Sequence, residues 1–251
     1  MLPSDIDALH SGKLVIEQPA QKVEVLTAGE MVQMTHVGLA TSFAMGIFAG
    51  MNEMAAAEST WAQERKEALK ALQPYVKTMN NLALSEDFYT LGKSVGAAVP
   101  WLRSSGSQVI LANGSHGLDH NQMRQATKRS GLNAVAFVMP KIVFLPSLKA
   151  LYVIGDIQVY VQGQKRVLFL SGGALIAGSK LAATAPTPGT SATKAIAGSD
   201  TSDAIEARAN LWFANDGARF KQGLDHATAV FSVKLKDYLT GIRATSNPYK
   251  Y

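Results

Sequence analysis

Two short stretches, Gln108-Val109-Ile110-Leu111-Ala112 and Ala134-Val135-Ala136-Phe137-Val138-Met139, decide the fold of this 251-residue chain. Both are apolar runs rich in residues that favour strands. A helix pattern lies between them. Asp119 is placed as its N-cap, Gln122 three residues later completes a capping box, and Gly131 suits the position just after the helix. The sequence therefore predicts a strand–helix–strand unit.

A second pattern begins after this unit. Residues from Leu151 to Val161 alternate between apolar and polar, and Gln162-Gly163-Gln164 can turn the chain back into Val167-Leu168-Phe169-Leu170. This predicts a long antiparallel hairpin. The hairpin, at about 150–171, offers edges for pairing with further strands. The apolar residues that we assign to this pairing edge are Val153, Ile157, Val159 and Val161.

Parallel and antiparallel pairs together predict a mixed sheet. We therefore expect an α+β (mixed α/β) fold in which the sheet packs against several helices. We expect residues 1–251 to form a single domain, with 1–30 as an extended N-terminal arm. Residues 178–203 are mostly Ala, Gly, Ser, Thr and Pro, which predicts a flexible loop. The apolar stripe over 215–241 predicts a C-terminal helix that docks on the sheet.

Helix boundaries can be placed from the punctuating residues. Pro74 predicts a kink or boundary in one helix, and Pro100 predicts the end of another that begins at Ser85. Either Asn215 or Asp216 is expected to cap the last helix.

One long stretch, Met31 to Asn52, contains no Asp, Glu, Lys or Arg. Within it Ser42, Gly46 and Gly50 recur every four residues, the spacing of a small-residue face for helix packing or oligomer contact. We expect a buried helix here. A membrane-inserting helix over 31–57 is the alternative, since the stretch is long enough to cross a bilayer.

Charge and composition exclude several classes of function. The formal charge is +5 and the chain contains no cysteine, which excludes thiol catalysis, disulfides and thiolate-bound metals. Lys and Arg are scattered rather than gathered into one stripe, so no nucleic-acid partner is expected.

Few residues are candidates for chemistry. His116, Asp119 and His120 are the candidates for metal ligation, but Gly117 and the helix cap place them on a loop, so we expect no metal there. Gly173–Lys180 has the order Gly-Ser-Lys, whereas a phosphate-binding loop needs Gly-Lys-Ser or Gly-Lys-Thr. No catalytic residue and no cofactor are predicted, and an enzyme is the less favoured interpretation.

A resemblance points to a function. The helix with Leu91-Gly92-Lys93-Ser94-Val95, closing near Trp101-Leu102, leads through a strand to the segment Met123–Val135 and then to the alternating hairpin. Over about 85–172 this order resembles the periplasmic domains of curli-assembly (CsgG-like) lipoproteins and of TolB amino-terminal domains. The resemblance implies an envelope lipoprotein that acts in protein–protein assembly, with its signal and lipidated cysteine outside the present sequence.

The sequence thus predicts a non-enzymatic protein of the cell envelope, facing the periplasm and possibly anchored to the outer membrane by lipid. Its expected partners are other envelope proteins and copies of itself, in a surface or secretion assembly. The alternative is a cytoplasmic enzyme or small-ligand-binding protein that uses the loops 113–120 and 172–180.

Overall fold

The structure is a computed structural model. It describes residues 12–18, 23–26, 54–84, 88–102, 108–111, 119–181 and 201–245.

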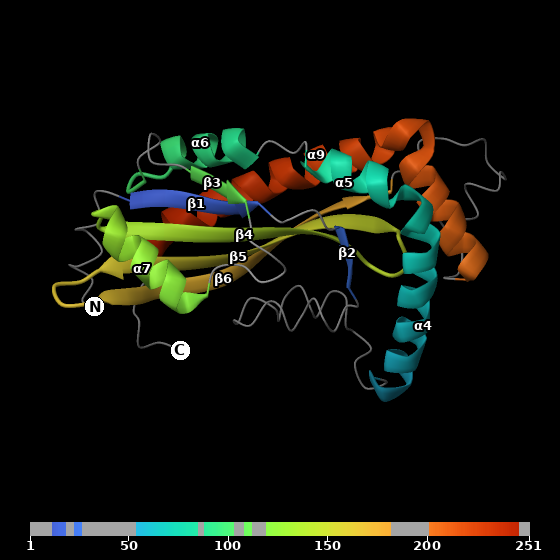
Figure 1. Ribbon diagram of the computed structural model, residues 1–251, viewed down its shortest axis with the longest axis horizontal. Coiled ribbons are helices and arrows are strands. Elements are labelled where there is room, and N and C mark those ends of the chain that lie inside the picture. Colours follow the sequence, from blue (N-terminus) through green and yellow to red (C-terminus); the bar gives the residue numbers. More distant parts are fainter. Residues whose placement is uncertain are drawn as a thin grey trace.

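One mixed sheet organises the described residues (Figure 1). Its strands follow the order β3-β1-β4-β5-β6, and β2 pairs with β4 beyond the end of β1. Strand β1 is parallel to both β3 and β4, whereas β4, β5 and β6 are antiparallel to one another. The predicted α+β class is therefore correct. The strands are β1 (Gly12–Gln18), β2 (Val23–Val25), β3 (Gln108–Leu111), β4 (Ala134–Phe144), β5 (Ala150–Gln162) and β6 (Val167–Lys180).

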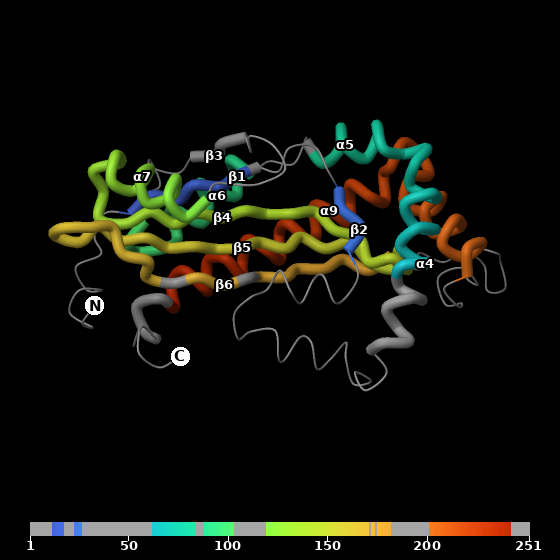
Figure 2. Tube along the Cα trace, turned by 60° about the horizontal axis from the view of Figure 1, so that its bottom comes forward, coloured from blue at the N-terminus to red at the C-terminus, as the bar shows by residue number. Residues whose placement is uncertain are grey.

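Helices cover both faces of the sheet, and α7 lies on the face opposite α9 (Figures 1 and 2). Alternation along β4 explains the two layers, since successive side chains point to opposite faces. Ala136 and Val138 join the main core with α9, whereas Val135 and Phe137 pack with Met123 of α7. The helices are α4 (Met54–Leu72), α5 (Val76–Leu84), α6 (Phe88–Ala98), α7 (His120–Ser130) and α9 (Ser202–Thr245), with a 3₁₀ turn η2 (Gln73–Tyr75) between α4 and α5.

The strand–helix–strand unit is confirmed as β3-α7-β4. The side chain of Asp119 accepts a hydrogen bond from the backbone N–H of Gln122 at 2.8 Å, and the side chain of Gln122 accepts one from the backbone N–H of Asp119 at 3.0 Å. Gly131 ends the helix with φ 65°, a left-handed conformation that favours glycine. The two strands of the unit are not neighbours, because β1 lies between them.

The predicted N-terminal arm over 1–30 is wrong for its central part. Gly12–Gln18 forms β1, an internal strand bonded to β3 on one side and β4 on the other. Leu14 and Ile16 are buried in the main core. The arm interpretation weighed Pro19 as an edge signal, but that proline falls after β1 has ended.

The hairpin is confirmed, but its assigned edge is wrong. Strand β5 pairs with β4 along one side and with β6 along the other, so it is internal. The four side chains assigned to a pairing edge lie in the main core; they are Val153, Ile157, Val159 and Val161. On this side the sheet ends with β6 instead. This strand continues to Lys180, so the loop predicted at 172–180 is wrong, and the loop predicted at 178–203 is wrong for 178–180.

The last helix is longer than predicted. Helix α9 begins at Ser202, inside the predicted 178–203 loop, and runs to Thr245 with a kink at 214–217. Asn215 and Asp216, the predicted caps, lie in this kink with left-handed φ values of 52° and 55°. The apolar stripe of the second segment packs on the sheet as expected, with Phe220, Leu224 and Phe231 fully buried.

The small-residue face of Ser42, Gly46 and Gly50 lies outside the described residues, as does the rest of 31–53. Among the helices that the structure describes, none has the length and apolar character needed to cross a membrane.

Candidate functional site

A chain of hydrogen bonds runs along one face of β5 and ends on α7. The alternating residues Asp156, Gln158 and Tyr160 share this face. The amide nitrogen of Gln158 donates to a carboxylate oxygen of Asp156 at 3.1 Å, and the hydroxyl of Tyr160 donates to the amide oxygen of Gln158 at 2.9 Å. Nδ1 of His120, the first residue of α7, is hydrogen bonded to the Tyr160 hydroxyl.

The donors and acceptors along this hydrogen-bond chain follow one direction. The single proton of the Tyr160 hydroxyl is donated to Gln158, so this oxygen can only accept from His120. Nδ1 of His120 therefore carries a proton, and in the neutral imidazole Nε2 is the atom with the free lone pair. Since His120 is an exposed residue, Nε2 of the neutral imidazole is free of this hydrogen-bond chain and can accept a hydrogen bond or bind a metal.

Aromatic rings surround Tyr160 within this hydrogen-bond chain. Tyr160 is fully buried and contacts the rings of Phe137 and Phe169, while His120 lies edge-on to Phe169 at 6.0 Å between ring centres. Burial raises the pKa of Tyr160. The Arg124 guanidinium lowers this pKa, and the Asp156 and Asp119 carboxylates raise it. Tyr160 is thus neutral at physiological pH and acts as a hydrogen-bonding link.

The metal candidates are only partly brought together. His120 lies in the chain, Asp119 uses its carboxylate to cap α7, and His116 lies outside the described residues. No group of three or more potential metal ligands occurs in the part of the chain that the structure describes.

The second candidate feature is the edge of β6, the outermost of the three long strands (Figure 2). The backbone N–H of Leu181 donates to the carbonyl of the residue directly opposite, Lys149, at 2.8 Å. Opposite residues of an antiparallel pair alternate between bonded and non-bonded. The N–H and C=O groups of Ile176 and its alternate neighbours therefore point away from β5, toward the side of β6 on which no strand of the described residues pairs. These outward-facing residues are Gly172, Ala174, Ile176, Gly178 and Lys180.

A lysine of α9 occupies the middle of this edge. The ammonium of Lys234 donates to the Ile176 carbonyl at 2.7 Å, which agrees with the outward direction derived from the pairing. No other hydrogen bond to these outward-facing groups comes from the residues of the described ranges. A long open edge pairs readily with other strands, and a lysine placed on it is a common protection.

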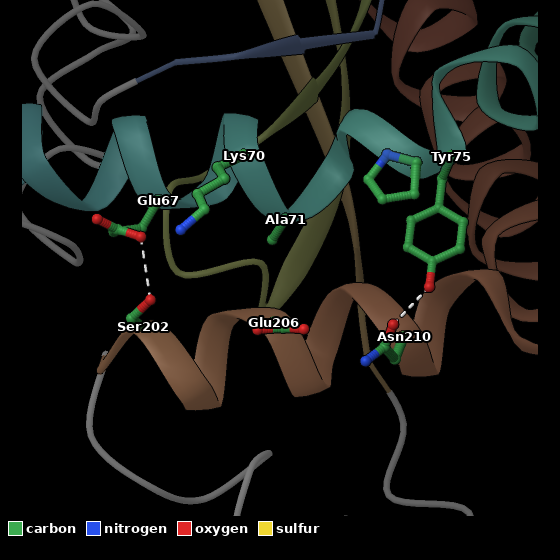
Figure 3. A pocket seen from close by; sticks show the side chains of 8 residues that line it. Glu67, Lys70, Ala71, Tyr75, Ser202, Glu206 and Asn210 are labelled. Atoms are coloured by element: carbon green, nitrogen blue, oxygen red, sulfur yellow. Dashed lines mark hydrogen bonds between the residues drawn. The ribbon is translucent and has the colours of Figure 1, made fainter.

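A small cavity lies at the other end of the molecule, between α4 with η2 and the first segment of α9 (Figure 3). Its volume is about 130 Å³. Ser202 donates to Glu67 across it at 3.0 Å, and Tyr75 is hydrogen bonded to Asn210. Tyr75 also stacks on Phe213 at 4.9 Å between ring centres. These contacts join the two helices to each other, so we assign the cavity to helix packing.

Sequence reasoning missed the roles of Asp156, Gln158 and Tyr160. The alternating pattern placed them on the polar face of the hairpin, but it could not bring His120 over that face. The pattern gave no signal for this contact, because a tyrosine and an amide also suit a strand face that meets water.

Comparisons with known proteins add little. No family model and no curated protein matches the chain. Among solved structures, the hypothetical protein CT253 from Chlamydia trachomatis is similar with a TM-score of 0.32 and 10% identity, covering 93% of this chain and 98% of that one.

Proposed function

We propose that this chain is a non-enzymatic protein of the cell envelope that binds other proteins by adding their extended segments to the open edge of β6. The observation that carries the proposal is the row of outward-facing backbone groups at Gly172, Ala174, Ile176 and Gly178. Strand addition uses such groups for affinity and alternate side chains for specificity.

The composition of β6 suits this role. The strand has 14 residues, of which only the last, Lys180, is charged. Phe169 near its start is 47% exposed and gives an added strand an apolar surface to cover. Strands β4 and β5 are paired on both sides, whereas β6 has one side on which no strand from the described part of the chain pairs.

A proline placed on the edge tests the proposal. Ala174→Pro removes an N–H that points away from β5, so the pairing of β5 with β6 stays intact while an added strand loses a partner and meets the proline ring. Ala174→Thr keeps the N–H and is the matched control. Cross-linking in cells, followed by identification of the cross-linked proteins, should give the same partners for wild type and Ala174→Thr, and should lose them for Ala174→Pro. The same partners with all three proteins would overturn strand addition at β6.

The cellular location rests on the resemblance to envelope lipoproteins. We propose a periplasm-facing protein, held at the outer membrane by lipid, with copies of the chain among its partners. Fractionation of cells and mass spectrometry of the native gene product test the location and the lipid, and sedimentation of the purified protein tests self-association. An unlipidated product in the cytoplasmic fraction would contradict the envelope assignment while leaving the edge of β6 to be judged by the proline variant.

A second candidate function is the binding of a small ligand at His120, favoured by the hydrogen-bond chain that leaves Nε2 free. A thermal-shift screen with metabolites and divalent metals tests it, because a ligand that binds the folded state raises the midpoint in proportion to the logarithm of its concentration. A shift that His120→Gln abolishes supports this site. A screen without a response, or a shift that His120→Gln leaves unchanged, contradicts it.

A further inference from the structure

The ammonium of Lys234 is held on the backbone of the edge strand at the point where a partner would pair. An added strand needs the outward carbonyl of Ile176 as an acceptor, so it competes with Lys234 for this oxygen. A displaced ammonium needs a new partner, and a carboxylate on the added strand is the group that satisfies it best.

The charges on β6 itself and in the turn before it have the same sign, whereas α9 carries the exposed carboxylate of Asp237 three residues after Lys234. Lys165 and Arg166 are exposed in the turn that leads into β6, and Lys180 is exposed at its end. The strand itself contains no acidic residue. Positive charges therefore mark both ends and the middle of the edge.

This arrangement disfavours a second copy of the chain as the occupant. Two β6 strands paired antiparallel about their centre would place Lys180 of each beside Val167 of the other, next to Lys165 and Arg166. Pairing in parallel and in register would bring Lys180 against Lys180. Like charges directly opposite one another destabilise strand pairs.

We infer that the occupant of the β6 edge is an extended, acidic segment of another protein, and that Lys234 is the residue that selects it. This inference rests on the proposed function. Without a carboxylate to receive it, the ammonium stays on Ile176, so neutral or basic strands bind this edge more weakly than acidic ones.

The inference can be tested by binding three peptides to the full-length protein. Each peptide has alternating Val and Thr and blocked termini, and the three differ only in having Glu, Gln or Lys at the central polar positions. We expect the Glu peptide to bind about twofold to fivefold more tightly than the Gln peptide at low salt, since exposed ion pairs contribute at this level, and the Lys peptide to bind most weakly. Calorimetry or fluorescence anisotropy measures the three dissociation constants.

Variants of Lys234 distinguish the effect of its charge on peptide preference from the effect of uncovering the Ile176 carbonyl. Lys234→Gln keeps a hydrogen-bond donor for the Ile176 carbonyl but removes the charge, so the preference for Glu over Gln should fall by about the contribution of one ion pair, roughly twofold to fivefold. Lys234→Arg should restore it. Unchanged preference in Lys234→Gln would remove Lys234 from the selecting role.

The outcomes of these experiments distinguish failure of the acidic-partner inference from failure of strand addition at β6. Equal binding of all three peptides, lost in Ala174→Pro, would overturn the acidic partner while supporting strand addition. Binding of no peptide, or binding that Ala174→Pro leaves unchanged, would overturn both. A concentration-dependent dimer of wild type that Ala174→Pro abolishes would make a second copy the occupant and overturn the inference alone.

Discussion

The exposed imidazole of His120 donates through Nδ1 to the hydroxyl of Tyr160, a residue with no exposed surface. The contact joins the start of α7 to a residue near the end of β5, 40 residues later in the sequence. It fixes the tautomer of the histidine and satisfies a buried hydroxyl at the same time. Both effects can be measured separately.

Tyr160→Phe removes the hydroxyl and keeps the ring. We expect the free energy of unfolding to fall by about 1–2 kcal/mol, because Gln158 loses its donor and His120 its acceptor. Urea unfolding measures this loss. Nitrogen NMR of His120 should show the proton on Nδ1 in the wild type and a mixture of tautomers in the variant. An unchanged tautomer in Tyr160→Phe would show that the chain does not set it.

Stability should fall at high pH because of the buried Tyr160 and the partly buried Tyr152. Burial raises the pKa of Tyr152 and of Tyr160 above the ordinary value of 10.0. The unfolded chain therefore releases these phenol protons at lower pH than the folded chain. Stability is fully present below the unfolded pKa and is lost as pH rises through it toward the folded pKa. Urea midpoints measured from pH 8 to about pH 11 should fall less steeply in Tyr160→Phe than in wild type. Equal slopes would contradict the role of this residue.

The sequence patterns predicted the individual helices and strands better than they predicted which strands lie side by side in the sheet. The capping box at Asp119, the left-handed Gly131 and the alternation of β5 are local signals, and each was placed correctly. Which strand lies at a border depends on long-range pairing, and no local pattern records it. Strand β1 and β5 both read as edges for this reason, although each is bonded on two sides.

The candidate site shows the same limit. The sequence identified His120 as a polar residue of interest but not its contact with Tyr160, which requires α7 to cross β5. The Gly and Ala residues at 172–178 suggested a loop, because both are poor strand formers. Here pairing with β5 over the full length of the strand outweighs that weak preference.

Gly155 and Phe231 form a tight contact between β5 and α9. A Cβ added at Gly155 would clash with the ring of Phe231, which is fully buried. We expect Gly155→Ala to reduce the free energy of unfolding by about 1–3 kcal/mol through overpacking. Phe231→Leu alone should also destabilise, by leaving space in the core.

The double variant tests whether the two residues act through the same contact. Combining Gly155→Ala with Phe231→Leu should cost less than the sum of the single changes, because the smaller side chain makes room for the new methyl group. Denaturant unfolding of the four proteins gives the coupling energy. Simple additivity would show that the penalty at Gly155 arises elsewhere.

The kink of α9 stores conformational strain at defined residues. Asn215 and Asp216 have left-handed φ values, as does Gly217 at 81°. Asp216→Gly removes the steric cost of that conformation at an exposed position, so we expect stability to stay equal or rise by up to about 1 kcal/mol. Gly217→Ala should instead destabilise by about 1 kcal/mol or more, since it adds strain and its Cβ would lie 2.7 Å from Cδ1 of Leu82. Thermal unfolding distinguishes the two signs. A straight helix through 214–217 would give the reverse order, because glycine is the poorer helix former and alanine the better.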